Sequence, residues 1–242
     1  MAHRSPSLRA QPQPQLPFIF LNLAMTADGK IASANRAVTH FGSPRDLRHL
    51  YELRATADAI LCGARTVEQS HTTLGNGGES HRRRRLRNGL AEYPVRVVVS
   101  GSGTISPTAE IWAKRFSPIV VLTTKAASTR RAKHLRKLAD HVWVSGTHEI
   151  DFSAAFSQLR TEFGVQRLLC EGGGAVNDAL FRANLVDEIH LTICPLILGG
   201  RNAPTISDGV GVARLAEAAR FELRSVRKHG NELFLVYRKR PT

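Results

Sequence analysis

One stretch decides the fold class: Arg167-Leu168-Leu169-Cys170-Glu171-Gly172-Gly173-Gly174-Ala175-Val176-Asn177. It begins with an apolar run of strand length, 167–170, which is followed by Glu171 and three consecutive glycines. A helical pattern then covers about 175–183. A buried strand that leads through a glycine turn into a helix is typical of a parallel sheet in an α/β protein.

The three glycines also indicate a binding site. Residues without a Cβ let backbone amide groups approach a ligand closely, and a helix N-terminus carries about half a positive elementary charge. We therefore expect a phosphate or pyrophosphate at Gly172, Gly173, Gly174 and Ala175, the alternative being a tight turn with no ligand. The pattern is neither a Rossmann fingerprint, because Asn177 stands where a small residue is needed, nor a P-loop, since no Gly-Lys-Ser/Thr follows.

Outward from this stretch, apolar runs of strand length alternate with helical patterns. The expected strands are 18–23, 59–62, 95–99, 119–122, 141–144, 167–170, 188–193, 220–226 and 233–237. Helices are expected to begin after Ser43 and Ser128, and a further helix at 152–163 to end at Gly164. No helix separates the last two strands. The expected fold class is thus α/β: a mixed, mostly parallel central sheet with helices on both faces and an antiparallel C-terminal edge.

Composition narrows the class of protein. The 242 residues are 42% hydrophobic, which is enough for a buried core, and no apolar run is long enough to span a membrane. The polar, Pro/Gln-rich segment 1–16 is expected to be a disordered tail without an export signal, so residues 17–242 form the domain and the cytoplasm is the expected location. Cys62, Cys170 and Cys194 lie in or beside apolar runs and are expected to be buried thiols, and no metal site is expected.

The net charge of +14 would attract polyanions, including phosphorylated small molecules. Two basic clusters are prominent, an arginine-rich run at 81–87 and a predicted helix around 130–137. We interpret them as a solvated loop and a solvated helix face. A basic nucleic-acid-binding module is an alternative, but the sequence contains none of the motifs of such modules.

In parallel sheets, ligands bind beyond the carboxyl ends of the strands. Gly63 and Thr66 follow one such strand, and Asn22 is a polar residue within another apolar run. Asn22 is therefore either buried with satisfied hydrogen bonds or faces a ligand. Glu171, at the end of its strand, is either a solvated terminus or a carboxylate that holds a sugar hydroxyl or steers a proton.

Taken together, the segments resemble the C-terminal reductase domain of the RibD family of riboflavin biosynthesis, whose fold is similar to dihydrofolate reductase. The resemblance extends over 17–237. The motifs that carry it are Asn22-Leu23-Ala24-Met25-Thr26-Ala27-Asp28-Gly29-Lys30, Ser43-Pro44, Arg54, the segments 60–67, 94–99 and 171–177, Leu185-Val186-Asp187-Glu188, Pro195-Leu196-Ile197-Leu198-Gly199-Gly200, Ala203-Pro204-Thr205 and Asp208-Gly209-Val210-Gly211.

The resemblance implies an NADPH-dependent oxidoreductase that reduces the ribose of a phosphorylated ribosylaminopyrimidine to a ribityl group by hydride transfer. It also implies a homodimer. The residues implied for the cofactor are Gly63, Thr66, Ser70, Ser100, Gly101, Gly172, Gly173, Gly174 and Ala175. Those implied for catalysis are Asn22 and Glu171, and those for substrate binding are Arg54, at the 5′-phosphate, and Leu74.

Two departures from the family pattern concern the substrate. Arg65 replaces a small residue of the cofactor loop, and Ser70 replaces an acidic one. These two substitutions leave open the alternative that the chain is a divergent reductase of the same fold, which acts on dihydrofolate or another pterin-like molecule. The zinc-deaminase motifs often fused ahead of this domain do not occur in the sequence, so a stand-alone reductase is expected.

Overall fold

The computed structural model describes residues 15–37 and 40–240, and within them the strands form one mixed sheet in the order β5-β4-β3-β2-β6-β1-β7-β9-β8. The strands are β1 (Phe18–Thr26), β2 (Ala59–Gly63), β3 (Val95–Val99), β4 (Ile119–Thr123), β5 (His141–Val144), β6 (Arg167–Cys170), β7 (Glu188–Cys194), β8 (Phe221–His229) and β9 (Glu232–Lys239). Along this order, the neighbouring strands from β5 through β4, β3, β2, β6 and β1 to β7 pair in parallel. By contrast, β9 pairs antiparallel with both β7 and β8. The predicted fold class is confirmed.

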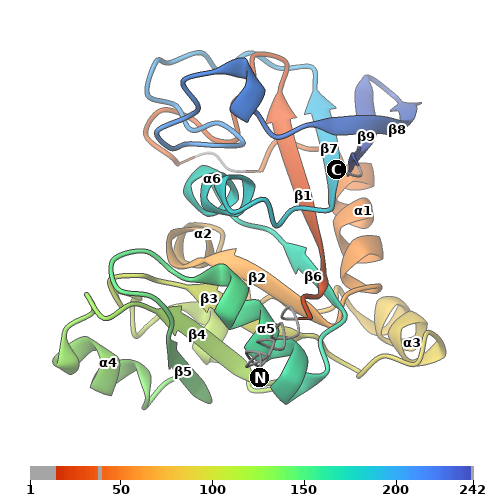
Figure 1. Cartoon of the computed structure of the whole chain (residues 1–242). Coiled ribbons are helices and arrows are strands. Elements are labelled where there is room, and N and C mark those ends of the chain that lie inside the picture. The colour runs from red at the N-terminus through yellow and green to blue at the C-terminus, as the bar shows by residue number, and fades with distance from the viewer. Residues whose placement is uncertain (1–14, 38–39, 241–242) are drawn as a thin grey trace, which may run out of the picture.

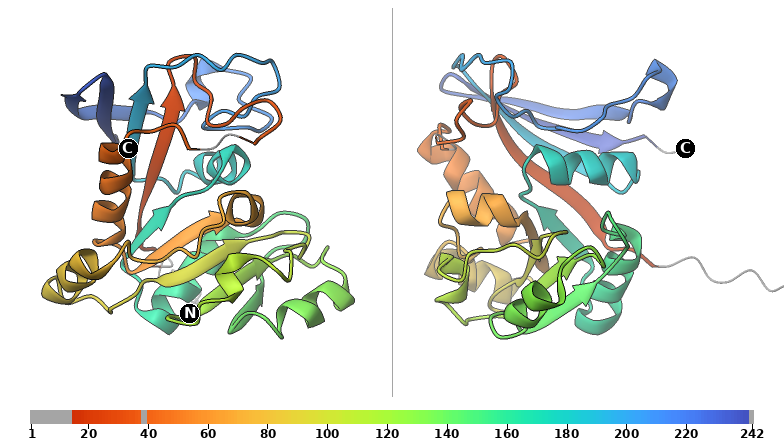
Figure 2. Two further views of the ribbon diagram at one scale, coloured as in Figure 1. Left: turned by 180° about the vertical axis from the view of Figure 1, so that it is seen from behind. Right: turned by 90° about the vertical axis from the view of Figure 1, so that its left-hand side faces the viewer.

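Helices cover both faces of this sheet (Figure 1). They are α1 (Pro44–Arg54), α2 (Ala64–Gln69), α3 (Glu79–Arg87), α4 (Thr129–Leu135), α5 (Phe152–Phe163) and α6 (Gly174–Arg182), with short 3-10 turns at η1 (Glu110–Trp112) and η2 (Leu215–Glu217). The sheet twists strongly, so that the β8–β9 hairpin lies across one end of the molecule and β2 to β5 at the other (Figure 2).

Strand alternation divides the core into two apolar layers. Leu21 of β1 packs with Phe156 of α5 and Leu180 of α6 on one face of the sheet. Phe20, the preceding residue, packs with Leu53 of α1 and other buried side chains on the opposite face. The three cysteines are buried within the core, as predicted, and burial raises the pKa of the Cys170 thiol to about 12.

Several helix ends follow directly from the sequence. The Ser43 and Ser128 side chains accept hydrogen bonds from first-turn amides of α1 and α4, as predicted for N-caps. Gly164 ends α5 in the left-handed conformation, with φ of 66°. The strands of the β8–β9 hairpin extend beyond the predicted ranges because exposed polar residues, which carry no strand pattern, continue the pairing around Gly230.

The predicted N-terminal tail, 1–16, lies outside the described residues except at its end. There, Arg160 of α5 donates hydrogen bonds to the Gln15 side chain (3.4 Å) and to the Leu16 carbonyl (3.5 Å). In the part of the chain that the structure describes, no helix has the length and apolar character needed to cross a membrane. Nor do those residues contain a group of three His, Cys, Asp or Glu side chains that could hold a metal ion.

The arginine-rich run at 81–87 lies in helix α3, so its prediction as a solvated loop is wrong. Arg85 is fully buried, and its guanidinium donates hydrogen bonds to the carbonyl oxygens of Arg54 (2.7 Å), Ala57 (2.6 Å) and Ala91 (2.8 Å). Burial lowers its pKa to about 10, which leaves the side chain protonated at neutral pH. Through these bonds α3 secures the C-terminal end of α1.

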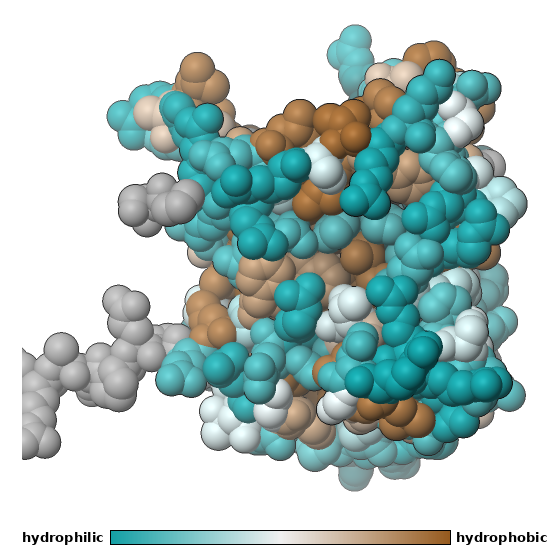
Figure 3. Space-filling model, turned by 90° about the vertical axis from the view of Figure 1, so that its right-hand side faces the viewer, coloured by the Kyte–Doolittle hydropathy of each residue, from teal (hydrophilic) through white to brown (hydrophobic). Residues whose placement is uncertain are grey.

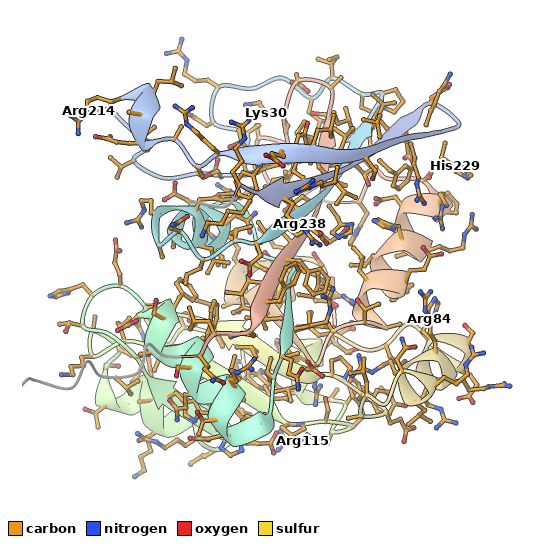
Figure 4. All side chains as sticks on the ribbon, turned by 45° about the vertical axis from the view of Figure 1, so that its right-hand side comes forward. Lys30, Arg84, Arg115, Arg214, His229 and Arg238 are labelled. Carbon is orange, nitrogen blue, oxygen red and sulfur yellow. The ribbon has the colours of Figure 1, made fainter. Side chains whose placement is uncertain are left out.

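Replacing Arg85 with methionine is expected to destabilise the protein by about 3 kcal/mol, because three carbonyl oxygens lose a charged donor. Arg84→Met is the matched control, since Arg84 is an exposed neighbour on the same helix (Figure 4) and should change stability by no more than about 0.5 kcal/mol. The free energy of unfolding in urea measures both effects. Equal losses for the two variants would contradict the buried role of Arg85.

Candidate active site

A cleft of about 1530 Å³ opens at the carboxyl ends of the central strands. This is where a parallel sheet is expected to bind its ligands. The predicted site residues that line it are Asn22, Arg54, Gly63, Thr66, Ser70, Ser100, Gly101, Glu171, Gly172, Gly173, Gly174 and Ala175. The fold therefore brings together residues from five separate segments of the chain.

Leu74 is the predicted site residue that the structure keeps away from the cleft. Its side chain is completely buried in the core layer beside α1, and its backbone has a left-handed φ of 54°. Thr73 and Gly75 on either side of it do line the cleft. As an apolar side chain, Leu74 anchors this loop to the core, which places its neighbours at the site.

The glycine-rich half of the cleft is formed where β2 and β6, which are neighbours in the sheet, lead into α2 and α6. Both helices begin at a glycine N-cap, Gly63 and Gly173, and neither has a side-chain cap. The amides of an uncapped first turn are available to a ligand, and for α6 they carry the positive end of a nine-residue helix. This arrangement suits a phosphate.

The space that a side chain would have differs among the three glycines of this loop. A Cβ at Gly172 would lie 2.9 Å from Val176, and one at Gly174 would lie 2.6 Å from the Asp208 carboxylate. These two positions are therefore required by packing within the protein. A Cβ at Gly173 would meet only the Thr66 hydroxyl, at 3.4 Å. Gly173 is thus the glycine whose surroundings remain open toward the cleft.

The turn after β3 completes this half. The Gly101 carbonyl accepts hydrogen bonds from the hydroxyls of Thr123 (3.1 Å) and Thr124 (2.9 Å). The Ser100 hydroxyl donates to the Thr104 carbonyl at 2.9 Å. Because its polar groups are bonded within the protein, this turn provides a rigid wall for the cleft.

Arg54 and Glu171 form a buried, bidentate ion pair in the cleft. The Arg54 Nε and Nη2 atoms each donate to a carboxylate oxygen of Glu171 at 2.6 Å, and Nη1 donates to the Gly75 carbonyl at 2.7 Å. Burial tends to lower the pKa of Arg54, but the Glu171 charge and hydrogen bonds hold that pKa above its usual value. Arg54 is therefore not the solvated side chain expected of an arginine on a helix. The pair joins α1, the loop at Gly75 and the start of the glycine loop.

Asn22 lines the cleft, so it is not the buried residue with satisfied hydrogen bonds that was one of the two interpretations of the sequence. Its Oδ1 atom is buried and has no hydrogen-bond partner among the residues that the structure describes. A buried carbonyl oxygen without a partner is costly, because it has lost its hydrogen bonds to water. A ligand that donates a hydrogen bond at this position would remove that cost.

Asp46 also lines the cleft, although it was not among the predicted site residues. It lies in the first turn of α1, where an acidic residue is ordinary, so its position in the sequence carried no functional signal. Burial raises the pKa of Asp46, and the nearby Glu232 charge adds to the increase, whereas a hydrogen bond from Thr192 opposes it. Only the packing of α1 on the sheet reveals this environment.

Comparison with known proteins identifies the family. A family model described as the RibD C-terminal domain matches residues 17–235. The chain belongs to this family. It is 35% identical over 221 residues to the 2,5-diamino-6-ribosylamino-4(3H)-pyrimidinone 5′-phosphate reductase of Methanothermobacter thermautotrophicus, covering 91% of this chain and 97% of that protein. The reductase of the same name from Archaeoglobus fulgidus is 34% identical over 193 residues, or 80% of this chain and 87% of that protein.

Solved structures named as pyrimidine reductases or as proteins like them have the same fold. A pyrimidine reductase-like protein from Corynebacterium diphtheriae superposes with a TM-score of 0.75 at 21% identity, over 93% of each chain. A diaminohydroxyphosphoribosylaminopyrimidine deaminase/5-amino-6-(5-phosphoribosylamino)uracil reductase from Thermotoga maritima superposes with a TM-score of 0.67 at 20% identity, over 93% of this chain and 57% of that one. The predicted RibD-type family and fold are confirmed.

Proposed function

We propose that the chain reduces 2,5-diamino-6-ribosylamino-4(3H)-pyrimidinone 5′-phosphate, the compound for which its relatives from M. thermautotrophicus and A. fulgidus are named, with NADPH as the hydride donor. Family membership makes it an oxidoreductase of the pyrimidine reductase type. The observation that carries the proposal is a single cleft that joins an uncapped helix N-terminus to a second region containing unpartnered polar atoms.

The size of the cleft fits a reaction between two ligands. Its volume of about 1530 Å³ exceeds the roughly 300–1,000 Å³ typical of a site for one small molecule. One half is lined by the glycine junctions after β2, β3 and β6, and the other lies between β1 and α1. Hydride transfer requires two reactants held in contact, which a continuous cleft allows.

The residues present fit NADPH in the glycine half. The first turn of α6 at Gly174 and Ala175 would hold the pyrophosphate, with Thr66 and the Ser100 turn beside it. Arg65, which is exposed and lines the cleft at the start of α2, would favour the 2′-phosphate of NADPH over NADH. When bound, the cofactor supplies the hydride. The protein's own residues orient the two reactants and exclude water.

A homodimer is part of the proposal. The β8–β9 hairpin exposes the apolar side chains of Leu223, Val226 and Leu233. The face of the molecule in Figure 3 shows apolar surface among the polar residues in its upper part. Exposed apolar surface of this kind is typical of a protein interface, and a second copy of the chain would cover it.

Purified protein is expected to oxidise NADPH when the diaminopyrimidine phosphate is added, and not when dihydrofolate is added. The loss of NADPH absorbance measures the reaction, and mass spectrometry of the product should show the gain of two hydrogens. The same pyrimidine without its 5′-phosphate is the matched control and should react more slowly, since it lacks the charged group. Oxidation with dihydrofolate alone would instead assign the chain to the divergent, pterin-type reductases.

A further inference from the structure

Asp46 presents an unpaired acceptor in the substrate half of the cleft. Among the described residues its buried Oδ1 atom has no hydrogen-bond partner, whereas the Thr192 side chain hydrogen-bonds to the same carboxyl group. Within residues 15–37 and 40–240, no lysine, arginine or histidine forms a salt bridge with Asp46. The charged group that contributes to its pKa shift is another carboxylate, Glu232 of β9.

Such an environment makes the ionised carboxyl group costly. Burial and the Glu232 charge raise the pKa of Asp46, and Glu232 is itself held in place by the Ser43 backbone amide (2.7 Å) and hydroxyl (2.5 Å). A buried polar group that has no partner within the protein often contacts a ligand, which then supplies the missing hydrogen bond. For a carboxylate oxygen, that partner is an N–H or O–H donor.

A second unpaired acceptor lies on the same wall. In the β1–β7 register, Thr192, the partner of Asp46, is directly opposite Ala24, and Asn22 is two positions along the same strand. Residues two apart on a strand face the same side, so the Asn22 amide points to the region that Asp46 occupies. Both side chains line the cleft, and both have a buried oxygen without a partner. The wall between β1 and α1 is therefore built to receive hydrogen-bond donors.

Gly42 restricts the position of the carboxylate. A Cβ at this residue would lie 2.3 Å from Asp46 Oδ2, so a side chain there would displace the carboxyl group. The Gly42 backbone thus packs against one oxygen of Asp46, and the other oxygen has no partner among residues 15–37 and 40–240. This leaves Oδ1 in a defined place to contact a ligand.

The family's two types of pyrimidine differ in the group they offer to such an oxygen. The substrate named for the relative from M. thermautotrophicus is a 2,5-diaminopyrimidinone, with an amino group at C2. That named for the protein from T. maritima is a 5-aminouracil, with a carbonyl group at C2. An amino group donates a hydrogen bond to a carboxylate oxygen, whereas a carbonyl oxygen is an acceptor and repels it.

We propose that Asp46 is a specificity-determining residue that accepts a hydrogen bond from the C2 amino group of the pyrimidine and so selects the diaminopyrimidinone over the uracil. The proposal rests on the function proposed above, because it assigns the pyrimidine to the half of the cleft between β1 and α1. It means that this enzyme acts on a pyrimidine that has not yet been deaminated. A deaminase that removes the C2 amino group would then follow it in the reaction sequence.

The test compares the two pyrimidine phosphates in the parent and in Asp46→Asn. An asparagine amide can donate to a carbonyl as well as accept from an amine, so the variant should lose most of the discrimination. We expect the parent to bind the diaminopyrimidinone more tightly, and the affinity ratio to fall by about 10- to 100-fold in the variant. Isothermal titration calorimetry measures both affinities without requiring turnover. The kcat/KM ratio provides a second measure.

Glu52→Gln is the matched control. Glu52 lies on the same helix, carries the same charge and is absent from the cleft lining, so its substitution should leave the affinity ratio unchanged. The Tm of Asp46→Asn should equal or exceed that of the parent, because the change removes a buried, unpaired negative charge beside Glu232. This measurement separates a change in recognition from a failure to fold.

Two results would overturn the inference. An unchanged affinity ratio in Asp46→Asn, or equal losses for both pyrimidines, would mean that Asp46 does not contact the C2 group. Failure of the proposed function has a different signature, since the parent would then oxidise no NADPH with either pyrimidine. The affinity ratios still decide the role of Asp46 in that event.

Discussion

Gly173→Asp is expected to lower the affinity for NADPH by at least about 100-fold, equivalent to about 2.7 kcal/mol. The substituted carboxylate would stand at the N-cap of α6, beside the Thr66 hydroxyl and at the place proposed for the pyrophosphate. Two negative groups would then compete for the same first-turn amides. Fluorescence titration with NADPH measures the loss.

Gly173→Ala is the control for bulk at this position. Its methyl group would approach Thr66 no closer than 3.4 Å, which is an ordinary contact, so the affinity should change by less than about threefold. Both variants should retain the parent's circular dichroism spectrum. If Gly173→Asp binds NADPH as tightly as the parent, the cofactor lies elsewhere in the cleft.

Breaking the Arg54–Glu171 ion pair is expected to have the largest effect on stability. Glu171→Gln leaves the Arg54 guanidinium buried without a counter-ion, and the removal of one partner from such a pair typically costs about 3–5 kcal/mol. For a protein of this length that loss corresponds to a fall in Tm of about 10 °C. Differential scanning calorimetry provides the measurement.

The same substitution should also impair catalysis. The pair connects α1, the Gly75 loop and the strand end that enters the glycine loop, all of which line the cleft. We therefore expect a fall in kcat/KM at temperatures where the variant remains folded. Glu149→Gln is the control, since Glu149 pairs with Arg182 on the surface and should contribute no more than about 1 kcal/mol. Similar Tm changes in the two variants would show that burial does not strengthen the Arg54–Glu171 pair.

The sequence predicted the elements whose determinants are local. The strand, glycine turn and helix around residues 167–177, and the N-caps at Ser43 and Ser128, each depend on neighbouring residues and lie where they were expected. That Gly63, Thr66 and the glycines at 172–174 line one cleft followed from the same logic, because the ends of parallel strands meet at one edge of a sheet, whereas Ser70, Ser100 and Gly101 were expected there only from the family resemblance.

The unpredicted features depend on contacts between distant segments. Arg54 and Glu171 are 117 residues apart, so neither position indicated that they form one unit. Arg85 is surrounded in sequence by exposed arginines, and only the carbonyl groups at the end of α1 make its burial favourable. Likewise, Leu74 is an apolar residue in a polar loop, and tertiary packing alone decided that it faces the core.

The central place of β1 in the sheet has a consequence for how the protein is made. Of the strands of the sheet, β1 is synthesised first, yet its partners are β6 and β7, and its pairing ends with Thr26 opposite Cys194. Pairing across so much chain is slow, because the entropy of closing a long loop is lost before any contact is gained. In contrast, β2 to β5 pair in the order in which they are synthesised. The strand that carries Asn22 must therefore wait for most of the chain, and the cleft exists only once folding is nearly complete.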